Sequence, residues 1–272
     1  MRWPARWAAR LTVGLLVAGI AFPLYWTVVS SLVPEARLYE GVGIVPDRLT
    51  TAHYRALFAE RDFWTPVRNS LVVAATTTLF CVSAGALCAY AIARLQFRGR
   101  RPLAALVLAV SMFPQIAIVS PLYLLLRALG LINTHPGLVL PYFTFAMPLT
   151  VWLLVAYFRQ LPRDLEAAAM VDGAGRLRTL WEIVLPLAVP GLATTAILTF
   201  VYCWNEFLFA LSFTTGPERQ TVPVAIALLR GQHQIPWGQV LAATVLSTLP
   251  VVGLVLTFQR RIVGGLTAGS IR

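Results

Sequence analysis

The sequence LVLPYFTFAMPLTVWLLVAYF, residues 138–158, decides the fold. It runs for 21 residues without a charged side chain, and a helix needs about 20 apolar residues to cross a bilayer. We therefore predict a transmembrane helix here. Five more uncharged or nearly uncharged stretches predict an all-α integral membrane protein with six transmembrane helices. These stretches are 11–33, 70–93, 103–126, 187–212 and 240–258.

The composition agrees with a chain whose main solvent is lipid. Hydrophobic residues make up 58% and charged residues only 12%, whereas soluble domains carry about 25% charged residues. The net charge is +11, and every basic residue is Arg. A basic balance can indicate nucleic-acid binding, but these arginines lie at the ends of apolar runs, which is the pattern of membrane topology. We expect membrane lipid as a partner, and no nucleic acid.

The arginines also predict the orientation of the chain. The run 11–33 is too long for the core of a signal peptide, so we interpret it as an uncleaved first span. With the N-terminus inside, fourteen of 22 arginines fall in inner segments. Five of the eight outer ones lie in the loop 34–69, which carries as many acidic residues. The positive-inside rule then places both termini in the cytoplasm.

Neither catalytic nor metal-binding chemistry is indicated. The three cysteines lie inside apolar runs, where they serve as small packing residues. The three histidines are scattered over loops predicted to lie outside. The chain also lacks the Gly-x-x-x-x-Gly-Lys-Ser/Thr phosphate loop of nucleotide-binding proteins. The residues concerned are Cys81, Cys88, Cys203, His53, His135 and His233.

One polar loop stands out, RQLPRDLEAAAMVDGAGRLRTLWEIVLP at 159–186. Asp164 can cap a short helix, and Glu166 then lies in its favourable first turn. Alanines continue the helix with little bulk, and Asp172-Gly173 ends it because glycine allows a left-handed turn. The small residues permit close approach by another protein.

A second short helix is predicted after the glycine. Its apolar residues share one face at spacings of three and four, and we expect that face to anchor the loop to the bundle or the headgroup region. Arg178 and Glu182 are spaced to pair on another face. By these residues alone, the loop is either a plain interfacial connection or a docking element. The apolar residues are Leu177, Leu180, Trp181 and Val184.

This loop resembles the EAA motif of ABC-importer permease subunits. The family pattern has Gly, nine residues, Ile, one residue and then Leu-Pro, and this chain matches it in register from Gly173. It departs at the position six before the glycine, where Ala167 replaces the usual Glu and the nearest acid is one residue earlier. The resemblance implies a cytoplasmic coupling loop that docks on an ATPase subunit. The residues implied are Glu166, Ala167, Ala168, Ala169, Asp172, Gly173, Ile183, Leu185 and Pro186.

The likeness extends over most of the chain and points to the maltose-type branch of carbohydrate-importer permeases. Matching segments occur in the same order, at Asn69-Ser70, 89–100, Pro121–Tyr123, Gly130–Thr134, Trp204–Phe207 and 265–269.

The resemblance implies a type I ABC importer permease fold, with residues 1–272 as a single transmembrane domain in a bacterial inner membrane. The implied partners are a second permease, as a heterodimer, two ATPase subunits that bind ATP and Mg, and an extracytoplasmic solute-binding protein. It implies no cofactor on this chain itself.

A substrate pathway is predicted around Glu206, the acidic residue inside an apolar span, since ionisable groups at membrane depth are functional candidates. Tyr202, Trp204 and Asn205 add hydrogen-bonding and stacking groups suited to a sugar. The alternative is that Glu206 faces headgroups or makes a packing hydrogen bond. Gln115 and Asn133 are weaker candidates, more typical of turn or packing residues.

Three other functions stay open at this point. Related importers carry glycerol phosphate or polyamines, although no arginine lies well inside a span to meet a phosphate. A secondary transporter would need an ion-coupling site, for which one glutamate is thin support. A membrane-embedded transferase would need an acidic metal-binding cluster, and the only acids at an inner edge belong to the loop 159–186.

Overall fold

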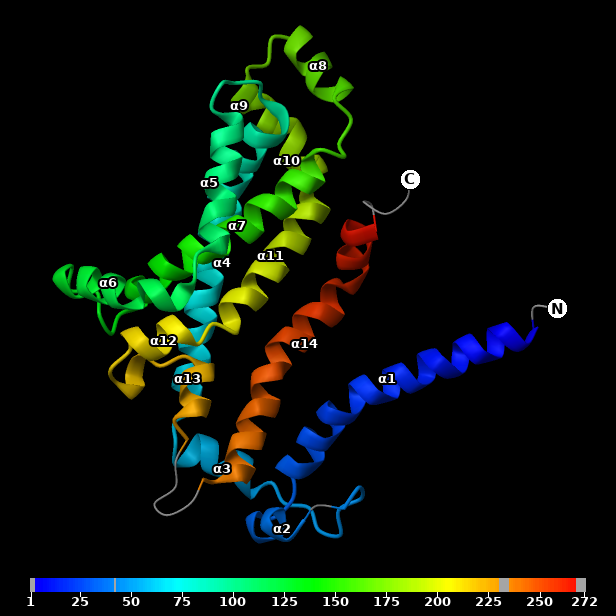
Figure 1. The fold of residues 1–272 in the computed structure, drawn as a ribbon, viewed down its shortest axis with the longest axis vertical. Helices are drawn as coiled ribbons and strands as arrows, with labels where there is room; N and C mark the ends of the chain where they lie inside the picture. Colours follow the sequence, from blue (N-terminus) through cyan, green and yellow to red (C-terminus); the bar gives the residue numbers. More distant parts are fainter. Residues whose placement is uncertain (1–2, 42, 230–234, 268–272) are drawn as a thin grey trace. The chain divides into compact units, whose positions relative to one another are not determined.

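The computed structural model describes residues 3–41, 43–229 and 235–267, with side chains for 10–41, 43–229 and 235–259 (Figure 1). The described residues form helices and no strand, which confirms the all-α prediction. The last two residues of the segment 265–269, together with His233, lie outside the described ranges. The helices are α1 Trp3–Ser31, α2 Glu35–Glu40, α3 Ala52–Ala59, α4 Trp64–Arg94, α5 Arg100–Met112, α6 Gln115–Ala128, α7 His135–Phe158, α8 Asp164–Val171, α9 Arg176–Thr179, the π-helix η1 Leu180–Val184, α10 Leu185–Leu187, α11 Val189–Trp204, α12 Leu208–Phe213, the 3₁₀-helix η2 Pro217–Arg219, α13 Val222–Ala227 and α14 Trp237–Thr267.

Four described helices are long and apolar enough to cross a membrane. Two further pairs pass the same test together, each bent sharply at a short break, so the described residues supply up to six spans. The exact count of six and the cytoplasmic termini stay predictions. The four helices are Arg10–Ser31, Trp64–Arg94, His135–Phe158 and Trp237–Gln259, and the pairs are Arg100–Met112 with Gln115–Ala128 and Arg176–Leu187 with Val189–Trp204.

Two predicted spans are interrupted in the structure. The stretch 103–126 is divided between α5 and α6, which meet at 95° (Figure 1). Phe113 is extended there, at φ −75° and ψ 129°, because the ring of Pro114 disfavours helical geometry in the preceding residue. The stretch 187–212 is likewise divided, since α11 ends at Trp204 and α12 begins at Leu208.

Other boundaries differ because helices continue beyond their apolar cores. The helix α4 has 31 residues and begins at Trp64, before the predicted 70–93. At 1.5 Å per residue it is about 46 Å long, which exceeds the roughly 30 Å hydrocarbon core of a bilayer. Its ends therefore project toward polar surroundings, and Arg94 is its last residue.

The chain divides into two compact units, Met1–Trp64 with Ala225–Pro250, and Thr65–Val224 with Val251–Arg272. In the first unit, the loop after α1 is held by polar contacts, since His53 Nε2 lies 2.9 Å from the carbonyl oxygen of Val33. Glu35 in turn accepts a hydrogen bond from the backbone N–H of Gly238. The single-domain prediction is not decided by this division.

The core of the second unit lies between α4, α7 and the segment that leads into α11. Small residues of α4 let α7 approach closely: a Cβ built on Gly85 meets the Thr150 side chain at 2.9 Å. Thr150 also hydrogen-bonds Thr199 of α11 at 2.9 Å. The buried cluster comprises Ala86, Ala89, Tyr90, Ile92, Ala93, Val151, Leu154, Val155, Phe158, Leu180, Val184 and Ala188.

Candidate functional site

The helix α8 is the short, mostly exposed helix predicted in the polar loop (Figure 1). It ends as the sequence predicts, because Gly173 adopts φ +82°. The N–H of Gly173 donates to the carbonyl of Met170, and the N–H of Ala174 donates to that of Ala169 at 2.9 Å. This pair of bonds is a Schellman motif, which satisfies two terminal carbonyls of the helix. The start differs from the prediction, since Asp164 is the first helical residue and Arg163 is the N-cap without a side-chain bond.

The two faces of α8 have different surroundings. Ala169 is buried and Glu166 is partly buried, and their spacing of three puts both on the inward face. Ala167, Ala168 and Val171 are exposed, and Val171 keeps 87% of its accessible surface. The small residues exposed on α8 are therefore Ala167 and Ala168, whereas Ala169 packs inward.

An ion pair fixes the inward face of α8. Arg94 Nε, at the end of α4, lies 3.0 Å from Glu166 Oε1, and the two side chains are only 3% and 14% exposed. The same guanidinium donates from Nη2 to the carbonyl oxygen of Leu161 at 2.6 Å. Glu166 thus faces its own chain. Sequence reasoning missed Arg94, because nothing local signals a contact 72 positions away.

The apolar residues predicted to share one face after the glycine differ in burial. Leu180 and Val184 are buried in the core, but Leu177 and Trp181 are 67% and 63% exposed. The prediction assumed 3.6 residues per turn, whereas Leu180–Val184 form a π-helix, whose wider turn separates residues that an α-helix would align. The predicted pairing of Arg178 with Glu182 is confirmed, with Nε 3.0 and 2.9 Å from the two carboxylate oxygens.

The remaining residues of the motif connect this loop to the membrane helices. Ile183 and Leu185 are half-buried, and Leu185 packs against the core cluster. Pro186 is exposed and lies inside the short helix α10. The chain then bends by 79° into α11, so α8 and the start of α11 are joined through residues that pack on α4 and α7.

The predicted pathway residues form a joint between α11 and α12. Asn205 Nδ2 donates to the carbonyl of Val201 at 2.8 Å, at the end of α11. The Glu206 carboxylate accepts from the N–H groups of Phe209 and Ala210, at 2.8 and 3.2 Å, at the start of α12. Glu206 thus satisfies N–H groups that the start of a helix leaves unpaired, whereas the Val201 carbonyl also accepts the backbone N–H of Asn205. Glu206 makes hydrogen bonds within its own chain, and its role in the pathway stays a prediction.

The other pathway candidates differ in exposure. Trp204 is 3% exposed and stacks on Phe200 with centroids 5.7 Å apart. Tyr202 is half-buried, and its hydroxyl accepts a hydrogen bond from Gln115 Nε2 at 2.9 Å. Gln115 begins α6 directly after the 95° break. Tyr202, Gln115 and the exposed Asn205 therefore gather where two predicted spans are interrupted.

Asn133 is a turn residue, as expected, and it joins two loops. It adopts φ +59°, and its Oδ1 accepts from the N–H groups of Thr215 and Gly216 at 3.1 and 3.3 Å. Its Nδ2 donates to Glu218 Oε1 at 2.6 Å. That hydrogen bond, together with the charge of Arg219, lowers the pKa of the Glu218 carboxyl.

A second amide orders the same region. Asn69 Nδ2 donates to the carbonyls of Glu218 and Gln220 at 2.9 and 3.0 Å. Its Oδ1 lies 2.9 Å from His135 Nε2, so that nitrogen must carry the proton. The other nitrogen, Nδ1, then accepts from Arg219 at 3.5 Å. Both ring nitrogens of His135 thus have partners within the chain.

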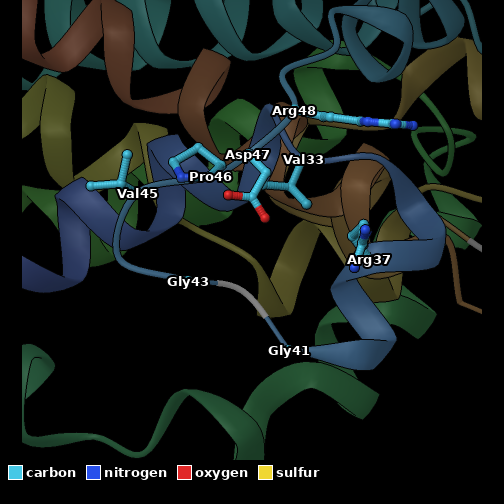
Figure 2. Close-up of a pocket in the computed structure, with 8 residues that line it drawn as sticks. All are labelled: Val33, Arg37, Gly41, Gly43, Val45, Pro46, Asp47 and Arg48. Carbon is cyan, nitrogen blue, oxygen red and sulfur yellow. The ribbon is translucent and has the colours of Figure 1, made fainter.

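A separate cavity lies in the loop after α1 (Figure 2). Its volume is about 170 Å³, which is below the roughly 300–1,000 Å³ typical of ligand sites. Figure 2 shows the Asp47 carboxylate pointing into the space and Arg48 extending away from it. Arg37 on its wall pairs with Glu40 at 3.0 Å, and no aromatic ring lines it. The cavity is not a candidate for a sugar site.

No group of three metal-binding side chains occurs among the residues that the structure describes. The distinctive features of the structure are the two interrupted predicted spans, 103–126 and 187–212, and the short, mostly exposed helix α8. This arrangement defines a class of protein, a multi-pass α-helical membrane protein.

The chain belongs to the family described as binding-protein-dependent transport system inner membrane component, whose profile matches residues 81–267. This confirms the resemblance drawn from the EAA loop and places the chain in an inner membrane. Among similar proteins are the trehalose/maltose transport system permease protein MalG of Thermococcus litoralis and the trehalose transport system permease protein SugB of Mycobacterium tuberculosis. The first is 43% identical over 96% of each chain, and the second is 44% identical over 94% of each chain.

The fold agrees with solved transporters. A bacterial ABC transporter for the acidic polysaccharide alginate matches 95% of this chain and 96% of its own, with a TM-score of 0.77 and 23% identity. At that identity the match supports the type of fold alone, an importer permease fold.

Proposed function

We propose that this chain is the membrane-spanning permease subunit of an ATP-driven, binding-protein-dependent importer of a sugar or oligosaccharide. The names of its relatives support the substrate class, since they include trehalose and maltose permeases and a diacetylchitobiose uptake permease from Streptomyces coelicolor. The proposed domain is the whole chain, with six spans and both termini in the cytoplasm.

The observation that carries the coupling role is the geometry of α8. A helix of eight residues, closed by its own turn at Gly173, presents Ala167, Ala168 and Val171 to solvent. Small side chains let a partner backbone approach closely, and an exposed valine supplies apolar area to bury. We assign this face to an ATPase subunit and call α8 the coupling helix. ATP and Mg would be bound by that partner, because this chain has no phosphate-binding loop.

The substitution of Ala167 for Glu bears on how docking works. Glu166 is turned inward to Arg94 and does not supply the missing carboxylate on the outer face. Docking here would rest on shape and apolar contact rather than on a charge from this chain.

The proposed complex contains further subunits. A second permease, two ATPase subunits and an extracytoplasmic solute-binding protein complete it. A solved alginate transporter with a TM-score of 0.71 is described in complex with a pentasaccharide-bound periplasmic protein, which supports a binding protein as a partner. We propose that Asn205, Tyr202 and Gln115 face the pathway, since their exposed or half-buried polar groups lie at the two helix breaks.

The other solutes and mechanisms fit less well. The relatives at 40–44% identity are named for sugars or for sulfoquinovosyl glycerol, a sugar derivative, rather than for polyamines or glycerol phosphate. A family defined by its binding protein also disfavours a secondary transporter driven by an ion gradient.

Reconstitution tests the proposal. The chain is assembled in vesicles with its partner permease, ATPase subunits and binding protein, and uptake of labelled trehalose and maltose is measured with and without ATP. We expect ATP-dependent uptake that an uncoupler does not abolish. Uptake driven by an ion gradient without ATP, or uptake of glycerol phosphate or spermidine in place of sugars, would refute it.

A further inference from the structure

The end of α4 and the coupling helix are joined by one guanidinium group. Arg94 is the last residue of α4. Its Nε faces Glu166 at 3.0 Å, and its Nη2 donates to the carbonyl of Leu161, in the connection from α7 to α8, at 2.6 Å. One side chain therefore contacts the coupling helix and the segment that leads into it.

We infer that Arg94 is a positioning residue for coupling: it holds α8 to α4, so that movement of α8 is passed to α4. This inference rests on the proposed function for its consequence, but the attachment itself is a property of this chain. Neither the EAA pattern nor charge counting assigns Arg94 such a role.

Burial distinguishes this pair from the surface arginines. The Arg94 side chain is 3% exposed, whereas the Arg178–Glu182 pair in the same loop is 67% and 59% exposed. Water weakens an exposed pair and long side chains pay entropy to form it. Removal of one partner from a buried pair leaves an uncompensated charge, which is strongly unfavourable. Arg94 and Glu166 face each other as a shielded pair of charges at 3.0 Å rather than through a hydrogen bond, so separating them would leave two charges away from water.

The chemistry of arginine suits the position of Arg94 between two acceptors. A guanidinium is planar and always charged, and it offers several N–H donors in fixed directions. It can thus face a carboxylate with its charge while one N–H donates to a carbonyl, as Arg94 does with Glu166 and Leu161. A lysine offers a point charge on a flexible stem and would hold the two acceptors less rigidly.

The other end of α4 is attached as well. Asn69 Nδ2 donates to the carbonyls of Glu218 and Gln220, and Ser70 Oγ accepts from the N–H of Val222 at 2.8 Å. No break interrupts α4 between these contacts and Arg94. The helix thus connects the coupling helix to the loop 218–222 as one continuous element, in contrast to the broken α5–α6 pair.

The decisive experiment compares Arg94→Gln, Glu166→Gln and the double variant in the reconstituted complex. We expect each single variant to lower the sugar transported per ATP hydrolysed at least fivefold. The double variant should be no worse than the worse single one, because both changes remove the same contact. Arg94→Lys should restore part of the ratio, and the matched controls Arg178→Gln and Glu182→Gln should leave it unchanged.

Three results would overturn the inference. Additive losses in the double variant would mean that the two residues act separately. A loss confined to Glu166→Gln, with weaker binding of the ATPase subunit, would mean that Glu166 contacts the partner directly. An equal loss in Arg178→Gln would indicate a general effect of charge in this loop.

A second readout separates the inference from the proposed function. Amide hydrogen exchange of α8 is measured on the full-length chain in lipid nanodiscs, without any partner. We expect faster exchange in Arg94→Gln and in Glu166→Gln, but not in Arg178→Gln. Unchanged exchange in both Arg94→Gln and Glu166→Gln would refute the attachment of α8 to α4, even if wild-type transport is active. Faster exchange in both would support the attachment, even if the solute proves not to be a sugar.

Discussion

The turn at Gly173 offers the sharpest test of the coupling helix. Gly173 has φ +82°, and a Cβ built on it meets nothing within 4 Å. Gly173→Ala therefore adds conformational strain without a steric clash. A left-handed conformation costs an L-residue about 1–2 kcal/mol, which corresponds to a roughly five- to thirtyfold shift between closed and open forms of the turn.

The assay is hydrogen exchange at the end of α8, where the N–H of Ala174 is protected by its bond to Ala169. Exchange there should accelerate by about five- to thirtyfold in Gly173→Ala, and less in Gly173→Asn because Asn tolerates left-handed geometry. Gly173→Leu should in addition obstruct the docking face and uncouple ATP hydrolysis from transport.

Gly175→Ala is the matched control. Gly175 has φ −70°, which any residue adopts, and its Cβ would also lie in open space. The Gly175→Ala variant should therefore show the same amide exchange at the end of α8 as the wild type. The reasoning fails if Gly173→Ala also exchanges like the wild type, if Gly175→Ala is equally disturbed, or if Gly173→Leu assembles and transports normally.

The remaining predictions concern stability and the pathway. Glu206→Ala should destabilise the chain by about 1 kcal/mol through loss of a helix cap, measured by thermal unfolding, and unchanged uptake in both Glu206→Gln and Asn205→Ala would exclude a substrate role for them. Gly191→Ala should cost about 1–3 kcal/mol by overpacking, because its Cβ would overlap the ring of Tyr157 on α7, whereas Gly253→Ala, which lies inside α14 and meets nothing within 4 Å, should not destabilise the chain. Glu218 has a lowered pKa, so its contribution should be present above its ordinary 4.5 and be lost as the pH falls through the folded-state value; Glu218→Gln should therefore lower the unfolding temperature at neutral pH but not in acid, and an equal loss in acid would contradict this.

The membrane helices were predictable because an uncharged run of 21 residues leaves few alternatives to a span. Their breaks were not predictable, because prolines look alike in sequence. Pro121 lies inside α6, and Pro141 and Pro148 lie inside α7, whereas Pro114 separates α5 from α6. Whether a proline ends a membrane helix depends on how neighbouring groups satisfy the freed carbonyls, and those neighbours are set by the tertiary fold.

The candidate site likewise contains some features that were predictable from the sequence and others that were not. The turn at Gly173 and the pair Arg178–Glu182 were predictable, because both depend on residues within one or two turns of each other. The contact of Arg94 with Glu166 joins distant parts of the chain, and no local pattern reports it. The bonds from Glu206 to the start of α12 were readable in principle, since a carboxylate three positions before a backbone N–H can bind it, and a packing hydrogen bond was one of the two interpretations that the sequence left open.

The Schellman closure of α8 affects the thermodynamics of association. Ordering the backbone costs about 1–2 kcal/mol per residue, so folding eight residues on contact would consume on the order of 10 kcal/mol of the binding free energy. This chain meets that cost during its own folding, because Gly173 ends α8 and the partly buried Glu166 faces Arg94 without any partner. The proposed docking surface of Ala167, Ala168 and Val171 can therefore be modest in area and still bind, since its contacts need only offset the loss of rigid-body freedom.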